Sequence, residues 1–183
     1  MPRGGRHIAP RTRSTQRYVV KETNGMADSP PLVYVDANAF IYFLEGEEDV
    51  AKPILKLFSF LKNQRRTAVT SELTLAEVLP KARQREQRQV YLDLIVWSGI
   101  CELQPVSRDI LYETVDYRRS AATRLTGGQE IMPRLPDAIH VVTAVRSGCS
   151  RILSADARMR LPDGMARVDP NENAVAVLMR ELS

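Results

Sequence analysis

The chain has 183 residues, with 26 Lys or Arg, 22 Asp or Glu and a net charge of +4 at neutral pH. This length suits one domain plus a tail, and no apolar run reaches the roughly 18 residues that span a bilayer. The two cysteines, which lack a CxxC spacing, argue against a disulfide framework or a zinc knuckle. We therefore expect a cytoplasmic protein that makes no membrane contact.

The first 31 residues hold six of the basic residues and only two of the acidic ones. Residues 32–183 therefore carry 20 charges of each sign, so overall basicity is weak evidence for nucleic-acid binding. We expect residues 1–31 to be a disordered basic tail. Two explanations remain open: the tail is an arm that holds a polyanion, or the true start is Met26.

From residue 32 onward, strand and helix patterns alternate, which predicts one domain over residues 32–183. Short apolar runs bounded by turn residues indicate buried strands, and apolar residues at 3.6-residue spacing indicate helices. This alternation predicts a three-layer α/β/α sandwich around a mainly parallel sheet of about five strands. The aromatic residues Phe58, Phe60 and Trp97 are expected in its core. In chain order, the expected elements are a strand at 32–35, helices at 38–44 and 47–63, a strand at 67–70, a helix at 81–97, a strand at 101–106, a helix at 108–124, a Gly- and Pro-containing loop at 125–136, a helix at 137–147, a strand at 151–154, a weak strand at 166–168 and a helix at 171–182.

Four acidic residues lie where a parallel sheet collects its ligands, beyond the carboxyl ends of its strands. Asp36 directly follows the first strand, and Asp156 lies just past the fourth. Asp137 opens a helix, and Glu77 lies early in the segment after the second strand. Carboxylates so close together ionise cheaply only around a cation, and oxygen ligands suit Mg²⁺ or Mn²⁺. The pattern predicts a catalytic, metal-binding site that hydrolyses phosphodiesters.

Each acid also has a local explanation. Asp36 could cap the next helix, and Asp137 could be a first-turn acid favoured by the helix dipole. Glu77 could belong to a capping box or pair with Lys81 four residues later. Asp156 could be a turn residue. The prediction of a shared site therefore depends on the joint placement of the four acids.

Four segments of the chain resemble, in order, the motifs of PIN domains, over about residues 32–168. The closest resemblance is to the VapC-like ribonuclease toxins of prokaryotic toxin–antitoxin pairs. In that resemblance Asp36, Glu77 and Asp137 hold the metal ion and Asp156 completes the site. Asn38 and Ser154 then support the ligands by hydrogen bonds. The four segments are VYVDANAFIY (33–42), SELTLAEVL (71–79), LPDAIHVVTA (135–144) and ILSAD (152–156).

The resemblance implies an endoribonuclease that depends on Mg²⁺ or Mn²⁺, forms a homodimer and is inhibited by a small antitoxin protein. One alternative is a PIN-domain protein that processes or binds RNA outside a toxin–antitoxin pair. A more remote alternative is a receiver-like signalling domain. A receiver needs paired acids after the first strand and a Lys after the last one, whereas this chain has Asp36 alone and ends the last strand at Asp169.

Other residues have open interpretations. We expect Arg118, Arg119 and Arg124, before a Gly-Gly loop, to contact RNA phosphates. The basic cluster at 81–88 is either a second RNA contact or a solvated helix face. His140 lies one turn after Asp137 on an apolar helix, where a packed histidine is expected rather than a site residue. Apolar residues between positions 43 and 60 are a candidate surface for a dimer or an antitoxin.

Overall fold

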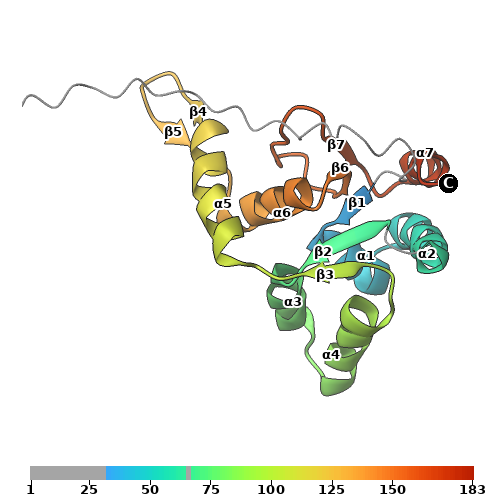
Figure 1. Ribbon diagram of the computed structural model, residues 1–183. Coiled ribbons are helices and arrows are strands. Elements are labelled where there is room, and N and C mark those ends of the chain that lie inside the picture. Colours follow the sequence, from blue (N-terminus) through green and yellow to red (C-terminus); the bar gives the residue numbers. More distant parts are fainter. Residues whose placement is uncertain (1–31, 65–66) are drawn as a thin grey trace, which may run out of the picture.

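A five-stranded parallel sheet forms the centre of the computed structural model, which describes residues 32–64 and 67–183 (Figure 1). The expected tail at 1–31 and the alternative start at Met26 lie outside the described residues. The strand order is β3-β2-β1-β6-β7. The strands are β1 (Leu32–Val35), β2 (Ala68–Ser71), β3 (Glu102–Gln104), β6 (Cys149–Leu153) and β7 (Ala166–Val168).

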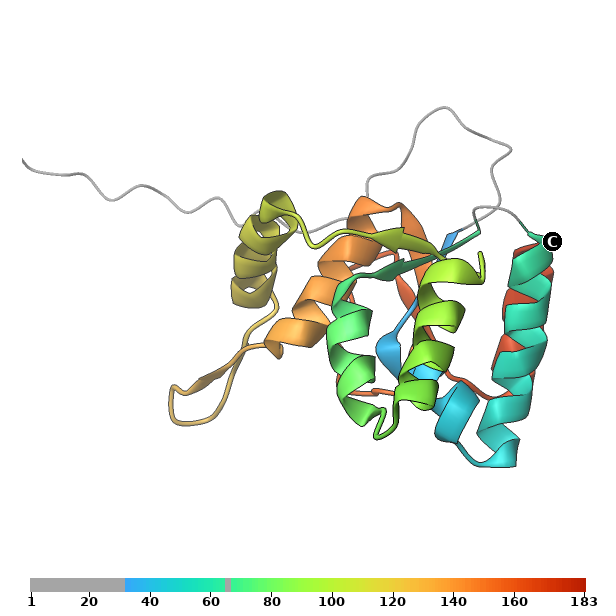
Figure 2. The same cartoon turned by 90° about the horizontal axis from the view of Figure 1, so that it is seen from below.

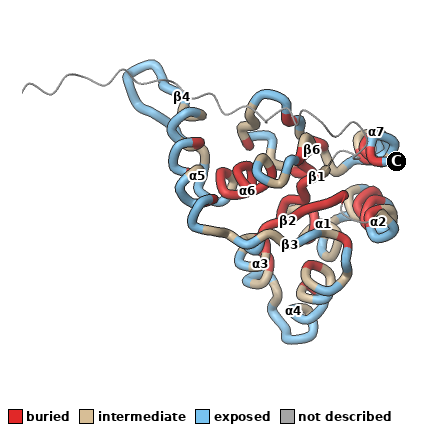
Figure 3. Tube along the Cα trace, in the orientation of Figure 1, coloured by how far each residue is buried: buried red, intermediate tan, exposed pale blue. Residues whose placement is uncertain are grey.

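Helices cover both faces of the sheet, as the sequence predicts. Successive residues of β1 point to opposite faces: Val33 and Val35 pack with α1, α2 and α7, whereas Tyr34 packs with α5 and α6. Figure 3 shows β1, β2 and α6 buried along most of their length. The helices are α1 (Ala37–Glu45), α2 (Glu48–Asn63), α3 (Leu73–Val78), α4 (Arg85–Leu92), α5 (Arg108–Ser120), α6 (Leu135–Arg146) and α7 (Glu172–Glu181).

The order of the strands locates the functional edge of the sheet. The chain runs outward from β1 to β2 and β3, and then returns to β6 on the other side of β1. This change of direction leaves a crevice beyond the carboxyl ends of β1 and β6, which is where ligands bind in open parallel sheets. Asp36 directly follows β1, and Ser154 directly follows β6.

The predicted helix at 81–97 is wrong as a continuous element. A 3-10 turn (Leu79–Lys81) is followed by an extended link, α4, and a π-helical turn η2 (Asp93–Trp97). The wider π-turn shifts the face that later side chains present. Ile95 stays buried, but Trp97 is 75% exposed, which overturns its expected place in the core. Phe58 is buried as predicted, and Phe60 is partly buried.

A hairpin arm, formed by β4 (Thr123–Arg124) and β5 (Glu130–Ile131), replaces the end of the helix predicted at 108–124 and most of the loop predicted at 125–136. Gly127 and Gly128 have φ values of 114° and 86°, which residues with a side chain rarely adopt, so this pair permits the tight reversal. Figures 1 and 2 both show the arm at the outer end of α5, away from the sheet. Within the described residues, no helix has the length and apolar character to cross a membrane.

Candidate metal centre

Asp36 is the most deeply placed of the four acids, with only 3% of its surface exposed. It caps α1, because its Oδ1 accepts a hydrogen bond from the Ala37 N–H at 2.8 Å. Its Oδ2 accepts from Ser154 Oγ at 2.7 Å and from Asn38 Nδ2 at 3.3 Å. Asp36 therefore both caps a helix, as its local explanation holds, and presents a carboxylate held by the two polar residues that the sequence places beside it.

Glu77 lies on α3 and reaches across to α6. Its Oε2 is 2.6 Å from His140 Nε2, and the Glu77 side chain is 30% exposed. The capping box predicted for this segment does not form, because Thr74 Oγ1 instead makes a hydrogen bond with Thr70 Oγ1 at 2.9 Å. The start of α3 is held by Ser71, whose Oγ accepts from the Leu73 N–H at 3.1 Å.

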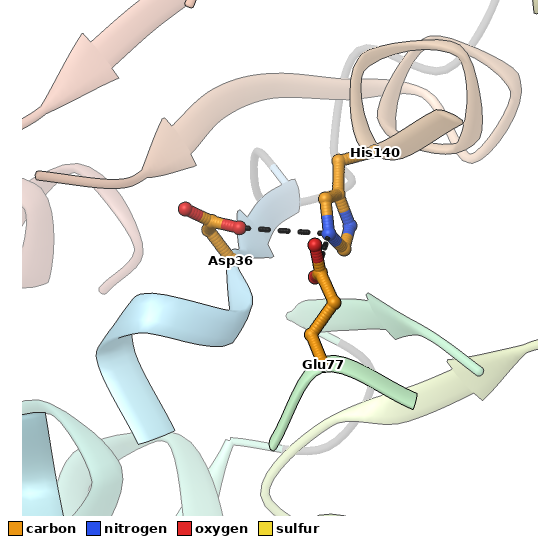
Figure 4. A group of neighbouring side chains, drawn as sticks. All are labelled: Asp36, Glu77 and His140. Atoms are coloured by element: carbon orange, nitrogen blue, oxygen red, sulfur yellow. Dashed lines mark hydrogen bonds and ion pairs between the residues drawn. The ribbon is translucent and has the colours of Figure 1, made fainter. Parts of the chain in front are cut away.

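His140 is buried, as a packed histidine should be, but it is also part of the site (Figure 4). Its Nδ1 lies 2.6 Å from the Tyr34 hydroxyl, and its Nε2 lies 3.7 Å from Asp36 Oδ1 as well as close to Glu77. The imidazole thus stands between two carboxylates from different elements. Its position three residues after Asp137, on the same helix face, is the sequence signal that could have assigned it.

Asp137 and Asp156 complete the ring of acids. Asp137 lies in the first turn of α6, and Asp156 lies in the loop after β6. Arg158 holds Asp156 in a two-pronged ion pair, with Nε and Nη2 each 2.9 Å from a carboxylate oxygen. The four acids line one open pocket of about 300 Å³, together with Ala37, Asn38, Ile41, Lys81 and His140.

The pKa shifts show that the acids crowd one another. Burial raises the pKa of Asp36, and His140 and Ser154 only partly oppose this. Burial also raises the pKa of Asp137, and the neighbouring charges of Asp156 and Asp36 raise it further. The hydrogen bond from Arg158 lowers the pKa of Asp156.

The same acidic residues also shift the pKa of His140. Burial lowers its pKa, but the hydrogen bond with Glu77 and the charge of Asp36 outweigh burial and raise the pKa above its ordinary value. A positive imidazole is therefore favoured between the two carboxylates. The raised pKa values of Asp36 and Asp137 show that the cations present do not fully offset the carboxylates, which is the electrostatic condition for binding a metal ion.

The donor atoms fit a divalent ion. One ligand atom each from Asp36, Glu77 and His140 lies within 4.8 Å of the others, and Asp137 and Asp156 line the same pocket. Carboxylate oxygens suit Mg²⁺ and Mn²⁺. The Nε2 atom of His140 is hydrogen-bonded to Glu77, so the ring supports a carboxylate and is not counted as a ligand. The residues present therefore fit the metal that the sequence predicts.

The arginines expected to contact RNA lie on α5 and the arm. Arg118 Nε donates to the Pro133 carbonyl at 2.9 Å, and Arg124 pairs with Glu130 across the hairpin at 3.0 Å. Arg119 is exposed. None of the three is among the described residues that line the pocket. Their role as RNA contacts stays a prediction.

Comparisons with known proteins found a matching family model and solved structures of similar fold. The model of the PIN domain matches residues 33–164. No curated protein sequence matches the chain. Among solved structures, VapBC2 from Rickettsia felis, bound to a DNA fragment from its promoter, is similar with a TM-score of 0.55 and 16% identity, over 75% of this chain and 98% of that one. FitAB bound to the IR36 DNA fragment is similar with a TM-score of 0.55 and 14% identity, over 76% of this chain and 95% of that one.

Proposed function

We propose, from the premise that this chain belongs to the PIN domain family, that it is a Mg²⁺- or Mn²⁺-dependent endoribonuclease. PIN domains are generally nucleases. The observation that carries the proposal is that four carboxylates from separate parts of the chain line the same pocket. We further propose that the protein acts in the cytoplasm as the toxin of a type II toxin–antitoxin pair.

In this proposal the acids divide the work. Asp36, Glu77 and Asp137 hold the ion, and Asp156 completes the site. A bound Mg²⁺ or Mn²⁺ ion would supply Lewis-acid chemistry, lowering the pKa of water and offsetting charge on the phosphodiester. Ser154 and Asn38 fix the Asp36 carboxylate, so that it needs no reorganisation when substrate arrives.

His140 is a positioning residue in the same proposal. Its ring holds the Glu77 carboxylate at 2.6 Å and is itself held by the Tyr34 hydroxyl. Tyr34 and His140 are both buried, which limits the orientations open to the ring. The hydrogen bonds from Tyr34 to His140 and from His140 to Glu77 hold a partly exposed carboxylate in the lining of the pocket.

A small antitoxin protein and a second copy of this chain are the proposed partners. The similar structures VapBC2 and FitAB support the antitoxin, because each is a complex in which the chain of similar fold is accompanied by an antitoxin and DNA. A short reading frame beside this gene, whose product binds the protein and stops cleavage, would support the toxin role. Without one, the alternative of an RNA-processing or RNA-binding protein outside a toxin–antitoxin pair gains support. The family match argues against the receiver-like domain.

Cleavage of a labelled single-stranded RNA by the purified protein tests the proposal. We expect internal cuts with Mg²⁺ or Mn²⁺, none with EDTA, and a loss of at least about a hundredfold in Asp36→Asn and Asp137→Asn, the scale of a lost metal or electrostatic contact. Glu86→Gln, which alters an exposed acid on α4, is the matched control and should cut normally. Undiminished cutting in EDTA or in either pocket variant contradicts the mechanism. Cleavage of DNA of the same sequence in place of RNA contradicts the substrate.

A further inference from the structure

Three cations are linked to the acid pocket, each from a different segment of the chain. Lys81, at the end of the 3-10 turn after α3, lines the pocket itself. Arg158 is paired to Asp156, which also lines it. Arg134 is the N-cap residue of α6, the helix whose first turn carries Asp137. The charges of residues 32–183 sum to zero, so these cations do not reflect a generally basic surface.

Arg158 has hydrogen-bond donors that its pairing with Asp156 does not use. Its side chain is 69% exposed, although its guanidinium grips Asp156 with two of its N–H groups. A guanidinium has five N–H donors in a planar fork, so three remain for another acceptor. Phosphate oxygens match that fork, and Arg158 is therefore able to hold Asp156 and a phosphate at the same time.

Arg134 is the third of these cations. It is exposed at the start of α6, where its carbonyl accepts from the Ala138 N–H at 3.0 Å. As the N-cap residue of α6, it lies three positions before Asp137, at the end of the helix that carries this acid to the pocket. A helix N-terminus beside an arginine also favours an anion electrostatically.

The negative charges of the four acids repel a phosphodiester that enters the pocket. A metal ion offsets part of this repulsion, but the phosphates on either side of the cut lie outside the pocket and need cations of their own. We propose that Arg134 and Arg158, with Lys81, form a phosphate clamp that binds the backbone of single-stranded RNA at the pocket mouth. The inference rests on the proposed function and names the surface that seats its substrate.

The test is RNA binding in EDTA, measured by fluorescence anisotropy over a series of salt concentrations. Each phosphate contact with a single strand contributes about 0.7 to the slope of log affinity against log salt. We expect Arg158→Gln and Arg134→Gln each to reduce that slope by about 0.7, and the double variant to reduce it by about twice as much. Arg180→Gln, on an exposed face of α7, is the control and should keep the wild-type slope.

Two further measurements keep the result unambiguous. Thermal unfolding of each variant identifies any loss of binding that comes from misfolding, and Arg158→Lys, which restores the charge, should recover most of the slope. If Arg158 serves only to neutralise Asp156, its Gln variant will keep the wild-type slope, and the clamp is overturned. Binding in EDTA needs no cleavage, so the two proposals can fail separately. If the wild type cuts RNA but both Gln variants keep the wild-type salt slope, only the clamp is refuted. If the wild type does not cut RNA but both variants have a reduced salt slope, only the nuclease is refuted.

Discussion

Among single residues, Asp137 is the one whose replacement should increase stability and abolish cleavage. Folding raises the pKa of Asp137 by burial and by the charges of Asp156 and Asp36, so its ionised form destabilises the metal-free protein. We expect Asp137→Asn in EDTA at about pH 7 to raise the free energy of unfolding by on the order of 1 kcal/mol, while it abolishes cleavage. Denaturant unfolding of the two proteins measures the difference.

The pH dependence gives the sign of this effect. A carboxyl with a raised pKa in the folded state contributes stability at low pH and loses it as the pH rises through that pKa. The advantage of Asp137→Asn should therefore shrink as the pH falls, because the wild-type carboxyl then takes up its proton. A variant less stable than wild type at neutral pH, or an advantage that does not change with pH, would be inconsistent with repulsion among the acids.

His140 offers a second prediction at this scale. His140→Leu leaves the Tyr34 hydroxyl and the Glu77 carboxylate without their partner, and should cost about 2–4 kcal/mol of unfolding free energy. His140→Gln retains a donor and should cost less. Chemical denaturation compares the two. If Leu is as well tolerated as Gln, the histidine only fills space, and its role in holding Glu77 is wrong.

The sequence places residues well where a strand end dictates their position, and poorly where contacts depend on side-chain direction. Asp36, Ser154 and Asn38 meet because β1 and β6 are neighbours and their ends carry these residues. The contact between His140 and Glu77 joins helices 63 positions apart in the chain, and it depends on rotamers that no spacing encodes. The pairing of Arg158 with Asp156 was missed for the same reason.

Among the elements, the segment from α4 to η2 presents the clearest test. Trp97 ends the π-turn and is 75% exposed, whereas Tyr91 on α4 is fully buried. We expect Trp97→Ser to change the free energy of unfolding by less than about 0.5 kcal/mol, and Tyr91→Ala to lower it by about 3–5 kcal/mol. Because Trp97 is the protein's one tryptophan, its fluorescence should also be readily quenched by iodide. Strong protection from iodide, or a large loss of stability in Trp97→Ser, would return this residue to the core.

Element boundaries follow the sequence where caps and glycines mark them. The helix start expected at 108 holds because Ser107 Oγ accepts from the Ile110 N–H, and the strand expected at 166–168 is observed as β7. Periodicity misled at 81–97, because the link after the 3-10 turn and the π-turn at Asp93–Trp97 disrupt the 3.6-residue repeat. The hairpin was missed because two-residue strands carry no alternation to read.

For the whole molecule, the proposed dimer has a defined candidate surface. Exposed apolar residues occur on α5, on the adjoining arm and at the start of α6, and charges of both signs interleave with them, which suits a surface shared by two copies of the chain. We expect a concentration-dependent dimer by sedimentation, with Tyr112→Asp monomeric and Val177→Asp, on α7, unchanged. A monomeric wild type, or a dimeric Tyr112→Asp, would rule out this interface. The apolar residues are Leu111, Tyr112, Val115, Leu125, Ile131, Met132 and Leu135.

At this scale the sequence predicts the architecture well. Alternating strands and helices require a layered parallel sheet, and the observed five-stranded order places the acids of β1 and β6 at one crevice. The candidate partner surface at positions 43–60 stays a prediction. Its aromatic residues are largely packed, which leaves Leu55 as an exposed apolar residue of this segment. A partner-binding surface depends on which apolar side chains stay exposed after folding, and the sequence alone does not give this.

The ends of β1 and β6 are the proposed metal centre of the protein. Titration of the metal-free protein with Mn²⁺ by calorimetry tests it without reference to any substrate. We predict saturable binding by the wild type, and at least a tenfold weaker affinity in Asp36→Asn, since losing a charged ligand costs more than the roughly 1.4 kcal/mol that a tenfold change represents. Equal Mn²⁺ affinity in the wild type and Asp36→Asn, or no binding by either, would contradict the account.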